Sequence, residues 1–172
     1  AYLERQCGRR VDRESIRATR HPRFAELVEA QSVLPGVREY LADARRLGLK
    51  LGVASSSSCK WVTGHLGRLG LAGYFDSVKS ADDVTHAKPD PELYRAVLDA
   101  MGLPAHRTIA FEDSPNGVLA AKRAGVFCVA VPNAVTRQLG FDGAGLRLDS
   151  LAEVPLEKLL SEVGAVRSGR KP

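Results

Sequence analysis

Cysteine, aromatic residues and long apolar runs are all scarce in this sequence. Its three cysteines, Cys7, Cys59 and Cys128, are an odd number and lack the spacing of a metal-binding motif. They argue against a disulfide framework and favour a reducing compartment, so we expect a cytoplasmic protein. No apolar run approaches the roughly 20 residues of a membrane helix, and the first residues lack the basic head and apolar stretch of a signal peptide. We therefore expect no membrane partner.

Acidic residues are outnumbered by basic ones, and the formal net charge of +5 raises the question of nucleic-acid binding. The excess is confined to the ends, because residues 1–23 hold seven arginines against three acids and residues 165–172 hold three basic residues and no acid. Aromatic residues make up 6% of the chain and do not alternate with the arginines, as they would in a protein that stacks bases. We therefore expect no nucleic-acid partner.

The 172 residues, 44% of them hydrophobic, are enough for one domain, or for one domain and part of another. Residues 1–31 have a helical pattern that Pro22 is expected to interrupt. Leu34-Pro35-Gly36 ends this pattern, and we place a domain boundary there, between residues 1–33 and 34–172. From residue 36 to residue 163, predicted helices alternate with short apolar strands. This pattern predicts a doubly wound α/β fold with a parallel sheet.

Apolar spacing, glycine and proline define the expected elements. Helices are expected over 37–47, 59–69, 90–101, 114–124 and 156–163, and strands over 49–54, 74–78, 108–111, 126–131 and 146–148. The strand over 108–111 is expected to be buried on both faces. In the helix after it, Ser114 is the expected N-cap, Pro115 the first helical residue and Gly125 the left-handed residue beyond the end.

Two adjacent carboxylates, Glu112 and Asp113, separate that strand from that helix. Ligands of an open parallel sheet bind at the carboxyl ends of the strands, so these acids lie where a site is expected. Neighbouring carboxylates repel each other, and a hard divalent cation relieves the repulsion. The alternative is a plain acidic turn in which Asp113 interacts favourably with the helix dipole. Both interpretations stay open on the residues alone.

Two other segments could hold an anion. Ser55 to Ser58 lie between a predicted strand and the start of a predicted helix, where hydroxyls and free backbone N–H groups can bind phosphate. Lys88 precedes Pro89, so we expect it in a stiff extended loop, from which its ammonium could neutralise a phosphate. The alternative for Lys88 is a solvated surface lysine.

The order of these segments is more informative than any one of them. Leu34-Pro35-Gly36, Ala54-Ser55-Ser56-Ser57, Lys88-Pro89-Asp90-Pro91 and Glu112-Asp113-Ser114-Pro115-Asn116-Gly117 resemble the haloacid dehalogenase superfamily of phosphohydrolases, in particular its beta-phosphoglucomutase-like branch. The resemblance implies a Rossmann-type parallel sheet in residues 34–172 and assigns residues 1–33 to the C-terminal part of a helical cap. It also implies a small phosphorylated metabolite as substrate, and we expect a monomer at full length.

The resemblance implies a role for each matching residue. Ser55 and Lys88 would be catalytic, with the Ser55 hydroxyl, the Ser56 backbone N–H and the Lys88 ammonium binding the phosphoryl group. Asp113 would bind Mg2+ directly, and Glu112 would act on the ion directly or through water. This division suits phosphoryl transfer, in which positioning and charge neutralisation supply most of the catalysis.

One feature of the family is missing from the sequence, namely an apolar strand that ends in Asp-x-Asp. The first Asp would be the nucleophile that becomes aspartyl-phosphate, and the segment Asp12-Arg13-Glu14 follows no apolar strand that would suit it. We expect the 172 residues to begin within the cap and to be inactive alone. The resemblance places the missing strand between the strands ending at Ala54 and Phe111, and its absence would leave an open apolar slot.

Two other functions remain possible on the sequence. A sugar-phosphate mutase would use the same residues, with a substrate hydroxyl in place of water as the phosphoryl acceptor. A catalytically inactive fragment or binding domain would keep the fold without the chemistry. A receiver-like signalling domain shares serine, lysine and acid, but the Lys88 loop and the helical leader argue against it.

Overall fold

The computed structural model describes residues 4, 8, 10, 12, 14, 23, 24 and 26–167. The chain divides into two compact units, residues 1–33 and residues 34–172. In the first unit, residues 26–29 are helical, and Arg23 forms an ion pair with Glu26 (3.1 Å). Pro22, the predicted interruption of this region, and Cys7 lie outside the described residues.

The second unit alternates helices and strands. Its helices are α3 (Val37–Arg46), α4 (Cys59–Arg68), α5 (Glu92–Met101), α6 (Pro115–Arg123) and α7 (Leu156–Arg167), with 3-10 turns η1 (Ala72–Tyr74), η2 (Ala81–Asp83) and η3 (Ala105–Arg107). Its strands are β1 (Gly52–Ala54), β2 (Ser77–Lys79), β3 (Ile109–Glu112), β4 (Phe127–Ala130) and β5 (Leu146–Arg147). Every paired strand is parallel to its neighbour, which confirms the predicted α/β class. No described helix is both long and apolar enough to cross a membrane.

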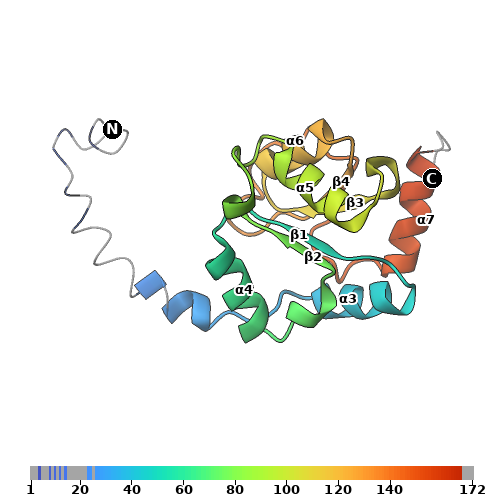
Figure 1. The fold of residues 1–172 in the computed structure, drawn as a ribbon, viewed down its shortest axis with the longest axis horizontal. Coiled ribbons are helices and arrows are strands. Elements are labelled where there is room, and N and C mark those ends of the chain that lie inside the picture. The colour runs from blue at the N-terminus through green and yellow to red at the C-terminus, as the bar shows by residue number, and fades with distance from the viewer. Residues whose placement is uncertain are drawn as a thin grey trace. The chain divides into compact units, whose positions relative to one another are not determined.

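Helices cover both faces of the strands (Figure 1). One core cluster joins α5 and α6 to one face and contains Tyr94, Ala110 and Cys128. A second cluster joins α3 and α7 to the other face and contains Tyr40 and Val129. Cys128 and Val129 are neighbours in β4 and belong to different clusters, because successive strand residues point to opposite faces. The fold is therefore doubly wound.

Two strands, β1 and β2, begin three residues later than the sequence pattern predicted. β1 begins at Gly52 and not at Leu49; the residue before it, Leu51, is held by Asp76, with its N–H donating to the Asp76 carboxylate (2.8 Å) and its carbonyl accepting from the Asp76 N–H (2.8 Å). β2 begins at Ser77, since Tyr74 lies in η1 and its N–H donates to the carbonyl of Leu71 (3.1 Å).

The strands form two sheets, with the orders β1-β2 and β3-β4-β5. A cavity of about 590 Å³ lies between them, lined by Ala54 of β1, by Ile109 and Phe111 of β3, and by mostly apolar residues of α3, α5 and α7. Phe111, which the sequence predicted to be buried, is 39% exposed, because one edge of β3 faces this cavity and no strand among the described residues pairs with that edge. The opening agrees with the expected apolar slot.

Candidate functional site

The predicted site residues lie at one edge of the two sheets. Ser55 directly follows β1, and Glu112 is the last residue of β3. Lys88, which comes after β2 in the chain, forms an ion pair with Glu112. At the opposite edge, the Lys50 ammonium, just before β1, donates to the carbonyl of Met101, at the end of the helix that leads to β3 (2.7 Å). The two sheets therefore run in the same direction, with their carboxyl ends at the predicted site.

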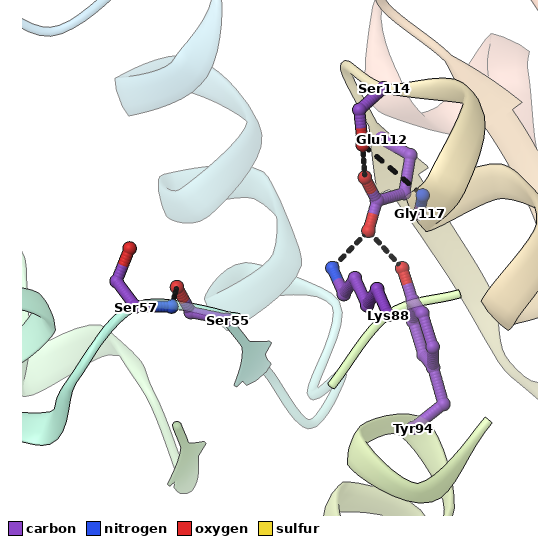
Figure 2. Close-up of polar contacts among 7 residues, drawn as sticks. All are labelled: Ser55, Ser57, Lys88, Tyr94, Glu112, Ser114 and Gly117. Atoms are coloured by element: carbon purple, nitrogen blue, oxygen red, sulfur yellow. Dashed lines mark hydrogen bonds and ion pairs between the residues drawn. The ribbon is translucent and has the colours of Figure 1, made fainter. Parts of the chain in front are cut away.

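Glu112 carries a buried carboxylate that receives two donors on one oxygen (Figure 2). The ammonium of Lys88 and the hydroxyl of Tyr94 both bind Oε1, the hydroxyl at 2.5 Å. The side chains of Lys88 and Glu112 are 13% and 6% exposed. A buried charge is tolerated only when it is paired and hydrogen-bonded, and this arrangement meets both conditions. Lys88 is consequently not the solvated surface lysine of the alternative interpretation.

The start of α6 is shaped to receive this carboxylate. Ser114 caps the helix as predicted, accepting the Gly117 N–H on its hydroxyl (3.1 Å), and the same hydroxyl lies 3.5 Å from Glu112 Oε2. A Cβ atom on Gly117 would lie 1.8 Å from Oε2 and 2.4 Å from Oε1. Glycine at this position therefore provides space for Glu112.

Asp113 points to a different neighbour from Glu112. It is exposed, and its Oδ2 accepts a hydrogen bond from the side-chain amide of Asn133, in the loop after β4 (2.8 Å). Within the described part of the chain, no hydrogen bond or ion pair joins Asp113 to Glu112, Lys88 or Ser55, and no three His, Cys, Asp or Glu side chains gather into a metal-binding cluster. Because Mg2+ keeps several waters and takes one or two carboxylates besides phosphate oxygens, the exposed Asp113 carboxylate fits as one ligand.

The serine loop is already hydrogen-bonded to η2. The Ser55 hydroxyl accepts the N–H of Ser57 (3.2 Å), and the N–H of Cys59, at the start of α4, donates to the Asp82 carboxylate (2.8 Å). The N-terminus of α4, which the sequence predicted to bind an anion, therefore already donates one N–H to a carboxylate of the chain itself. Among the described residues, none accepts a hydrogen bond from the Ser56 N–H or from the Ser55 hydroxyl. These two donors remain available to a ligand.

Tyr94 and the spatial role of Gly117 were not predicted from the sequence. Tyr94 has the same spacing as Val97 and Leu98 on α5, so its pattern is that of a core residue. The one feature of the sequence that could have linked Tyr94 to the site is its position six residues after Lys88. Cys128 is buried in β4, and burial, followed by the nearby Glu112 charge, raises the pKa of its thiol to about 12.

Comparison with known proteins identifies the family. The model of the haloacid dehalogenase-like hydrolases matches residues 5–131. This chain belongs to that family. YhcW of Bacillus subtilis (strain 168), which carries a provisional phosphatase name, is 46% identical over 164 residues, a stretch that covers 95% of this chain and 74% of the relative.

Solved structures agree with this assignment. The phosphate complex of CbbY from Rhodobacter sphaeroides is 35% identical with a TM-score of 0.72, and the match covers 83% of this chain and 66% of that one. A Thermotoga maritima protein, provisionally described as a beta-phosphoglucomutase, is 30% identical with a TM-score of 0.77, over 94% of this chain and 75% of that one. The chain therefore has the fold of haloacid dehalogenase-like hydrolases and resembles their beta-phosphoglucomutase-like branch. It spans about two thirds to three quarters of the length of these three proteins.

Proposed function

We propose that this chain is the larger part of a Mg2+-dependent phosphatase that acts on a small phosphate monoester. The observation that supports it is the buried Lys88–Glu112 pair at the carboxyl edge of the sheets, with the exposed carboxylate of Asp113 next to it in the chain. The phosphatase names among its relatives and the phosphate bound to the CbbY relative point to the same chemistry.

Each site residue has a proposed task. The Lys88 ammonium neutralises charge on the phosphoryl group, while the Ser55 hydroxyl and the Ser56 N–H donate to its oxygens. Asp113 holds Mg2+ directly, and Glu112, whose Oε1 already has two donors, acts on the ion through water. The bound ion supplies positive charge to the phosphate oxygens. Such fixed charges stabilise the transition state of phosphoryl transfer.

The attacking group comes from outside these 172 residues in this proposal. A carboxylate at the end of an added apolar strand, placed in the opening between β1 and β3, attacks phosphorus. The ester P–O bond breaks, and the second Asp of that strand donates a proton to the leaving alcohol. The same Asp then accepts a proton from the water that hydrolyses the aspartyl-phosphate and releases phosphate. In this proposal residues 1–33 form the C-terminal part of a helical cap, and the complete protein is a cytoplasmic monomer.

A complementation assay tests the proposal. We expect the chain alone not to hydrolyse p-nitrophenyl phosphate with Mg2+, and to gain activity when a synthetic peptide with an apolar strand ending in Asp-x-Asp is added. The control peptide has Asn in place of the first Asp and should give no activity. Turnover by the chain alone that the peptide does not increase would show that the nucleophile lies within the chain.

A sugar-phosphate mutase is the second candidate, because the Thermotoga structure described as a beta-phosphoglucomutase is 30% identical with a TM-score of 0.77. The complemented protein distinguishes the two activities when it is given a hexose 1-phosphate. A phosphatase releases inorganic phosphate, whereas a mutase produces the 6-phosphate isomer without release.

A further inference from the structure

Three polar groups meet in a buried position at the end of β3. The Lys88 ammonium and the Tyr94 hydroxyl bind the same oxygen, Oε1, of Glu112 (Figure 2). Tyr94 is 8% exposed, Glu112 is 7% exposed and the Lys88 side chain is 13% exposed, so water contributes little to satisfying these groups. The hydrogen bonds among them therefore decide how tightly each one is held.

Tyr94 touches Lys88 in a second way. The Lys88 ammonium lies over the Tyr94 ring, 5.0 Å from the ring centroid, in a cation–π contact. Tyr94 belongs to α5 and packs in the core cluster with Leu98, so its ring cannot easily move away. Lys88 lies in a loop and has a proline on its C-terminal side. The aromatic ring and the shared oxygen together define where the lysine head lies.

Sharing one oxygen has a consequence for anion binding. A carboxylate oxygen that accepts two hydrogen bonds attracts each donor less strongly than it would attract one alone. When Lys88 turns toward an incoming anion, the Tyr94 hydroxyl stays on Glu112 and keeps the buried carboxylate hydrogen-bonded, which avoids the penalty of an unpaired buried charge.

We propose that Tyr94 is a positioning residue that lets Lys88 be shared between Glu112 and a bound phosphoryl group. This inference rests on the proposed function, because it requires Lys88 to bind phosphate. Tyr94 does not touch the phosphate itself. It acts through the carboxylate with which Lys88 is paired.

The test is the affinity of the 172-residue chain for inorganic phosphate, measured by isothermal titration calorimetry with Mg2+ present. In Tyr94→Phe, Glu112 is left with Lys88 as its strong donor, so the lysine is withdrawn from the anion. We expect phosphate affinity to fall about tenfold, the equivalent of one hydrogen bond to a charged group. In a turnover assay with the added strand, KM should rise by a similar factor while kcat changes less.

Tyr40→Phe is the matched control. Tyr40 is as buried as Tyr94, at 7% exposed, and its hydroxyl also makes a 2.5 Å hydrogen bond, but to the carbonyl of Val154 on the other face of the strands. The Tyr40→Phe substitution should therefore leave the affinity for phosphate unchanged. A fall of equal size in Tyr40→Phe would mean that any lost core hydrogen bond has this effect, and would overturn the proposal.

A double substitution separates positioning from packing. In the Glu112→Gln background the shared carboxylate charge is gone, so adding Tyr94→Phe should lower phosphate affinity by less than twofold. An equal loss in both backgrounds, or an affinity of Tyr94→Phe within twofold of the unsubstituted chain, overturns the positioning role. If the positioning role is overturned but the unsubstituted chain binds phosphate and Lys88→Ala abolishes this binding, the proposed function still stands. If the unsubstituted chain does not bind phosphate, both proposals are overturned.

Discussion

Gly117→Ala should destabilise the protein, although glycine to alanine normally stabilises a helix. Gly117 lies inside α6, where alanine alone would add about 1 kcal/mol through helix propensity. The added Cβ would lie 1.8 Å from Glu112 Oε2 and 2.1 Å from Glu112 Cδ, closer than any non-bonded contact permits. The carboxylate must then leave its position.

The displaced carboxylate determines the size of the effect. Its departure leaves the Lys88 ammonium and the Tyr94 hydroxyl buried without their shared acceptor. Breaking a buried ion pair costs about 3–5 kcal/mol, and after the propensity gain of about 1 kcal/mol the net loss is about 2–4 kcal/mol. At about 2–4 °C per kcal/mol for a chain of this size, Tm should fall by about 4–16 °C.

Thermal denaturation followed by circular dichroism measures this change, with Gly64→Ala as the matched control. Gly64 is inside α4, and an added Cβ there would have nothing within 4 Å of it, so alanine should raise Tm slightly. The Glu112→Ala background supplies a second control, because it removes the clashing atoms. Gly117→Ala should be neutral or stabilising in that background. An unchanged or higher Tm for the single Gly117→Ala variant would refute the reasoning.

The remaining predictions concern single groups. Asp113→Asn should weaken Mg2+ binding at least tenfold by calorimetry and change the free energy of unfolding by less than about 1 kcal/mol, because Asp113 makes a surface hydrogen bond to Asn133; a large loss of stability would contradict this. Ser55→Ala and Lys88→Ala should each lower kcat of the strand-complemented protein by about 10²–10³, as loss of a charge stabiliser does, and full activity of either would remove that residue from the mechanism. Burial raises the pKa of the Cys128 thiol to about 12, so the folded state binds its proton more tightly than the unfolded state. The free energy of unfolding should therefore fall as pH rises from about 9 toward 12, and Cys128→Ala should flatten that dependence.

Much of the fold followed from local sequence. The cap and end of α6 were predicted from Ser114, Pro115 and Gly125, and Gly125 has the expected positive φ of 75°. These residues act within one turn of the chain, so their effect does not depend on distant partners. Strand starts were less predictable, since the residue before β1, Leu51, is held by the carboxylate of Asp76, 25 positions away in the sequence.

The sequence by itself determined the order of helices and strands and the chemical type of each site residue. It did not determine which of those residues meet. Only the tertiary structure decided that Glu112 pairs with Lys88 and Tyr94 while the adjacent Asp113 turns to Asn133. The physical reason is that adjacent residues at a strand end point to opposite sides of the chain. The partners of Glu112 therefore come from the Lys88 loop and from α5, and the partner of Asp113 comes from the loop after β4.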